Sequence, residues 1–200
     1  MSLFINHNVS ALNAAGTLSS TNRSIGDSFQ KVASGLRINK AADDAAGYGV
    51  AENLQAISRS ASVAMRNTND GISVVQTAEG ATNEVANILK RMRELAVESS
   101  SAVLNSTERS YIQDEFSQLT QEVDRLAEVT EFNGTNLTNG ASSTINVQVG
   151  VNNSANDRIS ITLGDLTAST LGVDTAAMSL NSVASAQAAI TLLDTALNSV

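Results

Sequence analysis

The fold of this chain is decided by the stretch VAENLQAISRSASVAMRNTNDGISVVQTAEGATNEVANILKRMREL, which occupies residues 50–95. Small apolar residues recur through it at steps of three and four, and no proline interrupts them. Apolar positions at this spacing fall on one side of an α-helix, which must bury that side against other helices. The seam consists of Val50, Leu54, Ile57, Ala61 and Ala64, and after a shift near Thr68 it continues as Ile72, Val75, Ala78, Thr82, Val85, Leu89, Met92 and Leu95. A helix of about fifty residues is roughly 70–80 Å long at 1.5 Å per residue, so it needs partners to cover its apolar side.

The composition favours long helices over a compact enzyme core. The 200 residues include no Pro, no Cys and no Trp, and aromatic residues make up only 3%. Proline breaks helices, and large aromatic residues dominate most globular cores, so both absences fit close helix–helix contact. The net charge of −8 argues against a nucleic-acid partner, because phosphate contacts need clustered Lys and Arg. No apolar stretch approaches 18 residues, so we expect no membrane insertion.

Residues 1–40 form an amphipathic arm with weak intrinsic helix stability. Ser, Asn and Gly are poor helix formers, so we expect this arm to be disordered alone and to fold on a partner. The pairs Arg23–Asp27 and Asp27–Lys31 have the i,i+4 spacing that gives weak support to a helix. The apolar face predicted to pack on that partner consists of Leu18, Ile25, Phe29, Val32 and Leu36.

Residues 41–200 form the second predicted domain, a rod-like helical region. Asp43 and Asp44 stand where the long helix begins, where negative charge suits the helix dipole. Asn105 and Glu108 have the spacing of a capping box that opens a helix at 106–129, folding back antiparallel on the first. The predicted core of the rod is Val50, Leu54, Ile57, Ile72, Val75, Leu89, Ile112, Phe116, Leu119, Val123 and Leu126.

The last third of the chain changes period. Asn133-Gly134 and Asn139-Gly140 indicate turns, and apolar residues then alternate strictly through 145–151 and 159–163. Alternation of this kind predicts a β-hairpin near 144–164. Helical spacing returns at about residue 184 and runs to Val200 without a cap, so we expect this helix to continue. The predicted fold is mainly α, a long antiparallel helical coiled-coil bundle with a small β-hairpin region.

The sequence offers no catalytic constellation. His7 is the one histidine, and it has no cysteine or second histidine with which to hold a metal. Gly47-Tyr-Gly49 falls short of a nucleotide-binding loop, and no HExxH, phosphate-binding or nucleophile motif occurs. Asp43 and Asp44 fit helix capping better than metal ligation, because adjacent carboxylates on a helix point apart. We therefore expect no catalytic residue, no metal and no cofactor, and so no enzyme.

A charged cluster at 90–95 allows two interpretations. Lys90 and Glu94 are spaced for an i,i+4 pair on a solvated helix flank. Alternatively, Arg91 held beside an exposed Leu95 would anchor a contact with another subunit or a receptor.

Several stretches of the chain resemble the bacterial flagellins. They are Ile5-Asn-His-Asn-Val-Ser-Ala-Leu-Asn-Ala14, Ser34-Gly-Leu-Arg-Ile-Asn39, Ala42-Asp-Asp-Ala-Ala-Gly47, Met92-Arg-Glu-Leu-Ala-Val97 and Glu131-Phe-Asn-Gly134. The stretches follow the order expected for the family, and the resemblance covers most of the chain, with most of the family's C-terminal half missing.

This resemblance implies a structural subunit that self-assembles into the extracellular flagellar filament for motility. Residues 1–40 would line the inner core of the filament, and export would use the flagellar type III apparatus. The implied partners are other flagellin subunits, an export chaperone, the filament cap and the flagellin-sensing Toll-like receptor of a host. Matched by position, Arg91, Leu95 and Glu115 fall on the family's subunit and receptor contact.

Three other readings remain open on the sequence. The hook–filament junction protein shares the terminal-helix pattern, although Arg93-Glu-Leu-Ala-Val97 and Phe132-Asn-Gly134 favour flagellin. A secreted coiled-coil adhesin or effector would not polymerise into tubes. An enzyme, such as a flagellin carrying a protease domain, would need HExxH or an equivalent.

Overall fold

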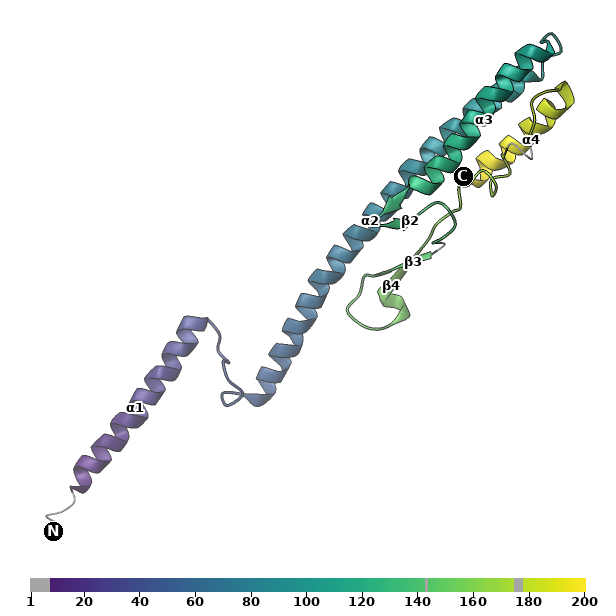
Figure 1. The fold of residues 1–200 in the computed structure, drawn as a ribbon. Coiled ribbons are helices and arrows are strands. Elements are labelled where there is room, and N and C mark those ends of the chain that lie inside the picture. Colours follow the sequence, from purple (N-terminus) through teal and green to yellow (C-terminus); the bar gives the residue numbers. More distant parts are fainter. Residues whose placement is uncertain (1–7, 143, 175–177) are drawn as a thin grey trace. The chain divides into compact units, whose positions relative to one another are not determined.

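The computed structural model describes residues 8–142, 144–174 and 178–200 (Figure 1). The chain divides into two compact units, Met1–Ser60 and Ala61–Val200. The predicted boundary at residue 40 lies inside the first unit. The helices are α1 (Val9–Ser34), α2 (Ala45–Ser99), α3 (Ser106–Val129) and α4 (Val183–Ser199). The strands are β1 (Glu131–Phe132), β2 (Thr135–Asn136), β3 (Thr144–Gln148) and β4 (Arg158–Thr162), with a short 3₁₀ turn, η1 (Ala155–Asp157), before β4. The mainly α fold with a small β region is as the sequence predicts.

Helix α1 is capped at both ends by local side-chain and backbone contacts. Asn8 accepts a hydrogen bond from the N–H of Ala11 at 3.1 Å, as an N-cap does. Gly35 ends the helix with φ of 70°, and its N–H donates to the Val32 carbonyl at 3.3 Å. Glycine suits this position because a left-handed backbone strains other residues. None of the described residues from 8 to 60 is buried, so tertiary burial contributes little to the first unit.

The core of the second unit lies between α2, α3 and α4. Figure 1 shows α3 beside the C-terminal part of α2, and because only residues 100–105 connect the two helices, they run antiparallel. Phe116 is completely buried and is the largest residue of this core. Residues from the three helices that form the cluster are Val85, Leu89, Met92, Leu95, Ala96, Ile112, Phe116, Val123, Ala127, Ala186, Ala189, Leu193 and Ala196. Alanines on α4 allow this helix to approach the other two closely.

The predicted core residues divide into two groups. Leu89, Ile112, Phe116 and Val123 are buried, and Leu119 and Leu126 are partly buried against the same cluster. The other five predicted core residues, by contrast, are exposed, with fractions from 43% to 61%: Val50, Leu54, Ile57, Ile72 and Val75. The prediction of a buried seam is wrong for this part of α2, because the core cluster begins only at Val85 and no described helix covers the earlier turns.

Local signals position the start of α3. Asn105 Oδ1 accepts from the Glu108 N–H at 2.9 Å, and Glu108 Oε2 accepts from the Asn105 N–H at 2.8 Å. This reciprocal pair is the capping box that the sequence predicts.

Two small hairpins follow α3. In the first, Asn133 (φ 51°) and Gly134 (φ 76°) form a two-residue turn between β1 and β2. Positive φ at both positions is what a type I′ hairpin turn requires. In the second, β3 pairs antiparallel with β4, with Ile145 opposite Ile161.

The second hairpin packs on α2. An added Cβ at Gly71 would lie 3.1 Å from a methyl group of Val147, so helix and strand approach closely there. Asn67 Nδ2 donates to the Gln148 carbonyl at 3.1 Å beside this contact. An apolar groove of about 240 Å³ remains between the two, lined by Thr68, Gly71, Ile72, Val75, Gln76, Val147, Val149, Ile159 and Ile161.

In the described part of the segment from 163 to 182, backbone groups form hydrogen bonds with side chains of the helices. The Ala168 N–H donates to Asp124 Oδ1 at 2.8 Å, and the Leu180 N–H donates to Gln113 Oε1 at 2.5 Å. The Leu180 carbonyl accepts from Ser99 Oγ at 2.6 Å. These bonds satisfy backbone groups that the helices would otherwise shield from water.

Candidate assembly and contact surfaces

The predicted contact residues Arg91 and Glu115 lie together on neighbouring helices. From α2, Arg91 donates to Glu115 Oε1 on α3 through Nη2 at 2.7 Å and through Nε at 3.0 Å. Its Nη1 donates to Glu94 Oε2 at 3.1 Å. Hydrogen bonding to Glu115, and then to Glu94, raises the pKa of Arg91 above its ordinary value. The guanidinium is therefore a fixed cation held between two carboxylates, and Glu94 pairs with Arg91 in place of the expected Lys90.

This ion-pair cluster remains accessible to a partner. The side chains of Arg91, Glu94 and Glu115 are 49%, 69% and 45% exposed. Exposed ion pairs of this kind contribute only about 0–1 kcal/mol each to stability. These ion pairs fix charged groups on the α2–α3 surface, and this is more relevant to recognition by a partner than to folding.

Leu95 does not belong to that surface. Its side chain is 1% exposed and is part of the core between the helices. The expectation of an exposed leucine beside Arg91 is therefore wrong, because the position one turn after Arg91 faces α3 and α4. A contribution of Leu95 to any contact would act through the shape of the core.

Two further arginines have roles that the sequence analysis missed. Arg93 Nε on α2 contacts Asp194 Oδ1 on α4 at 2.6 Å, and this pair joins residues 101 positions apart in sequence. Arg109 is 7% exposed and donates to the carbonyls of Ser99, Ser101 and Leu104 at 3.0, 2.6 and 2.6 Å. Its bond to Ser99 therefore satisfies the last carbonyl of α2, which lacks a helical partner, and the other two bonds hold the connection to α3.

An exposed row of apolar side chains lies on α1 and the residues directly after it. The five residues predicted to pack in the inner core are exposed, by fractions from 48% for Ile25 to 80% for Val32: Leu18, Ile25, Phe29, Val32 and Leu36. Isolated exposed apolar residues are ordinary, but a row of them at helical spacing indicates a surface that another element covers. Val50, Leu54 and Ile57 on α2 form a second such row.

Neither a metal site nor a membrane span is found where the structure describes the chain. No group of three or more His, Cys, Asp or Glu side chains gathers within residues 8–142, 144–174 and 178–200. Within these ranges no helix is both long and apolar enough to cross a bilayer. His7 lies outside the described residues. Asp44, one of the two carboxylates weighed as a metal ligand, instead accepts from the Gly47 N–H at 2.9 Å, as a helix cap does.

Exposed apolar rows on helices, beside an accessible ion-pair cluster, are typical of proteins that associate through their helices. Comparison with known proteins identifies the family. Residues 5–143 match the family model described as the bacterial flagellin N-terminal helical region. The chain belongs to the bacterial flagellins, and because these are structural proteins it is not an enzyme.

Individual relatives agree with this assignment. A flagellin of Halalkalibacterium halodurans is 39% identical over 198 residues, covering 99% of this chain and 72% of that relative. Flagellin D of Vibrio cholerae is 42% identical over 166 residues, covering 83% of this chain but only 44% of that relative. Among solved structures, the crystal structure of Bacillus cereus flagellin matches with a TM-score of 0.55 and 33% identity, over 66% of this chain and 75% of that one.

Proposed function

We propose that this protein is a filament-forming structural subunit of the bacterial flagellum. The observation that carries the proposal is the apolar row from Leu18 to Leu36, which is exposed in a chain that belongs to the flagellins. Burying such a row in water-excluded contacts with other subunits releases about 25 cal/mol for each Å² covered. Self-assembly supplies that cover, because every subunit presents the same row.

Export and localisation follow the family. The subunit would leave the cell through the flagellar type III apparatus with the help of an export chaperone, and it would join the filament beneath the cap. Its place would then be the extracellular filament. These expectations rest on the family assignment and on the weak helix-forming composition of residues 1–40, which suits transport in an unfolded state.

The test of filament formation is negative-stain electron microscopy of the purified full-length protein under polymerising conditions. We expect uniform tubes. Dispersed monomers under the same conditions would overturn the proposal and favour the secreted adhesin or effector. Short caps or rings that end on hook fragments, without extended tubes, would instead favour the hook–filament junction protein.

We further propose that the surface around Arg91 and Glu115 contacts neighbouring subunits in the filament and the flagellin-sensing Toll-like receptor on the monomer. Support comes from the fixed, accessible guanidinium between two carboxylates. Arg91→Ala should weaken both receptor signalling and tube formation while leaving thermal unfolding almost unchanged, because its ion pairs are exposed. Arg125→Ala, which removes a similarly exposed arginine paired with Glu122, is the control. Normal signalling and normal tubes from Arg91→Ala would remove the assignment.

A further inference from the structure

The chain contains two Asn-Gly pairs, Asn133-Gly134 and Asn139-Gly140, and their surroundings in the structure differ. In such a pair the backbone nitrogen of the glycine can attack Cγ of the asparagine side chain. Glycine favours this attack because it has no Cβ to hinder the approach and leaves the backbone free to rotate. The rate in a folded protein therefore depends on how closely and how freely these two atoms meet.

The Asn133-Gly134 pair is held in the turn of the first hairpin. Asn133 has φ of 51°, and the flanking residues Phe132 and Thr135 pair in the antiparallel ladder of β1 and β2. Rotation of the backbone at Asn133, which would bring its Cγ to the Gly134 nitrogen, disturbs this pairing. The fold thus opposes the reaction at the first pair.

The Asn139 side chain, by contrast, is folded over the backbone that follows it. Its Oδ1 accepts from the Ala141 N–H at 3.0 Å, an arrangement that brings the side-chain amide next to the peptide group between residues 139 and 140. The pair lies outside any strand, and Gly140 is exposed. Among the described residues no acceptor is found for the Gly140 N–H. The attacking nitrogen is therefore open to water, and the carbon that it attacks is close to it.

The Ala141 N–H also assists the reaction itself. Attack on Cγ moves negative charge onto Oδ1, and a donor already directed at that oxygen stabilises the charge as it develops. In the part of the chain that the structure describes, no group donates to Asn133 Oδ1. The two pairs have the same sequence but differ in backbone freedom and in this donor.

We propose that Asn139 is a site of spontaneous deamidation in the folded protein. The Gly140 nitrogen gives its proton to a solvent base and forms a bond to Asn139 Cγ, and the Cγ–Nδ2 bond breaks as ammonia leaves with a proton from water. Water then opens the five-membered imide ring. Breaking the ring bond to Cγ gives aspartate, whereas breaking the bond to the backbone carbonyl carbon gives isoaspartate, whose main chain is one atom longer. The reaction consumes one water, releases one ammonia, and is independent of filament formation.

Both products would disturb contacts near the end of α3. Asp165 Oδ2 lies 2.7 Å from the position that a Cβ on Gly140 would occupy, so the new carboxylate adds negative charge close to Asp165. Thr138 is 2% exposed, its Oγ1 donates to the Ala127 carbonyl at 3.1 Å, and its carbonyl accepts from the Leu166 N–H at 2.8 Å. An extra main-chain atom directly after Thr138 must displace either these bonds or Gly140. Isoaspartate should therefore destabilise the protein more than aspartate.

The first experiment follows deamidation of the full chain in mildly alkaline buffer by peptide mass spectrometry, with and without concentrated guanidinium chloride. In the folded protein we expect Asn139 to react about tenfold faster than Asn133 or more, since one directed donor gives at least this factor. In guanidinium chloride the two rates should become similar, because both pairs are then unfolded. Similar rates in the folded protein, a faster reaction at Asn133, or the same ratio in denaturant would overturn the proposal.

The second experiment compares Asn139→Ser with the matched control Asn133→Ser. Serine keeps an oxygen that can accept from the N–H two residues on, but it cannot form the imide. Each variant is incubated in its folded state, and its melting temperature is compared with that of the same variant before incubation. We expect a fall of about 2–4 °C for the unsubstituted chain and for Asn133→Ser, and none for Asn139→Ser. An equal fall in Asn139→Ser would place the damage elsewhere and overturn the proposal.

Asn139→Asp separates the added charge from the longer main chain. Freshly prepared Asn139→Asp carries the new carboxylate on an ordinary main chain, so its melting temperature should lie between those of the fresh and the incubated unsubstituted protein. A melting temperature that stays constant while isoaspartate accumulates at residue 139 would contradict the consequence derived from Thr138.

Discussion

Arg109 is the residue whose role depends most on the folded chain around it. Burial of a guanidinium is costly unless its donors are satisfied, and here three carbonyls of the α2–α3 connection accept from it. The bond to the Ser99 carbonyl satisfies the last residue of α2, and the other two hold the connection that follows it. One side chain thus connects the two helices whose shared core defines the second unit.

Arg109→Ala should lower the free energy of unfolding of this unit by about 2–4 kcal/mol, because it removes the donor to the buried Ser99 carbonyl and the donors to two partly buried carbonyls. The measurement is chemical denaturation followed by circular dichroism. Arg125→Ala on the same helix is the control, since Arg125 makes only an exposed pair with Glu122. It should change the stability by less than about 1 kcal/mol. Equal effects of the two substitutions would contradict the role given to Arg109.

At the scale of elements, two glycines of α2 distinguish a packing contact from a general helix preference. An added Cβ at Gly71 would lie 3.1 and 3.3 Å from the two methyl groups of Val147, whereas one at Gly80 would meet nothing within 4 Å. Both lie inside the same helix, so alanine removes the same backbone freedom at each. The difference between them therefore reports the contact of the hairpin with α2.

Gly80→Ala should stabilise the protein by about 0.5–1 kcal/mol, the usual gain in a helix interior. Gly71→Ala should gain less or become destabilising, because Val147 must move. Adding Val147→Ala removes both methyl groups and should restore the gain relative to Val147→Ala alone. Thermal unfolding of the four variants gives this comparison, and equal gains at Gly71 and Gly80 would show that the hairpin is not held against α2.

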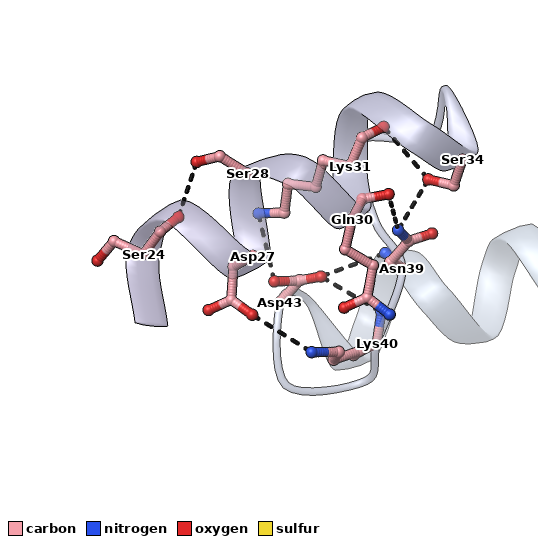
Figure 2. Close-up of polar contacts among 9 residues, drawn as sticks. All are labelled: Ser24, Asp27, Ser28, Gln30, Lys31, Ser34, Asn39, Lys40 and Asp43. Carbon is pink, nitrogen blue, oxygen red and sulfur yellow. Dashed lines mark hydrogen bonds and ion pairs between the residues drawn. The ribbon is translucent and has the colours of Figure 1, made fainter. Parts of the chain in front are cut away.

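Elements determined by short-range rules could be predicted from the sequence. The capping box of Asn105 and Glu108 and the turn at Asn133-Gly134 involve neighbours in the chain, so spacing alone is sufficient to predict them. Contacts across the fold could not be predicted in this way. Asp27 pairs with Lys40 in place of the expected Arg23 or Lys31, because the segment after α1 returns to it (Figure 2).

Burial along α2 also could not be predicted from the sequence pattern alone. Leu54 and Leu89 both belong to the apolar seam of α2, yet only Leu89 is buried. The reason is that α3 and α4 pack on the part of the seam that contains Leu89. Periodicity predicts which side of a helix is apolar, but the arrangement of other elements decides where that side is covered. Leu95 illustrates the converse: a family match suggested a contact residue, and the packing of three helices places it in the core.

For the whole molecule, carboxylates of the second unit link stability to pH. Hydrogen bonds from Thr170 and Thr167 lower the pKa of Asp165, and the Arg125 side chain lowers that of Glu122. A carboxyl group with a lower pKa in the folded state favours folding at pH above its ordinary value. That contribution is lost as the pH falls through the lowered pKa.

The melting temperature should therefore be nearly constant from neutral pH to about 5 and should fall below about pH 4. Asp165→Asn should lower the melting temperature at neutral pH and make the acid decrease shallower, because residue 165 then carries no titrating group. Asp70→Asn, at an exposed position of α2, should leave the curve as it is. A melting temperature that rises on acidification would contradict this linkage.

The two units should also respond differently to substitution, because every fully buried described residue lies after Ser60. Cooperative unfolding then reports the second unit, while the exposed apolar row of α1 contributes to assembly.

Phe29→Asp places a charge in that row at a side chain that is 70% exposed, and Ser28→Asp adds the same charge beside it on a polar side of the helix. Both variants should unfold within about 0.5 kcal/mol of the unsubstituted protein, since neither site is buried. Electron microscopy should show tubes from Ser28→Asp and none from Phe29→Asp, because an unpaired carboxylate in a buried subunit contact is strongly unfavourable. Normal tubes from Phe29→Asp would mean that the filament is built through other surfaces, and a lowered melting temperature would mean that α1 packs within the subunit.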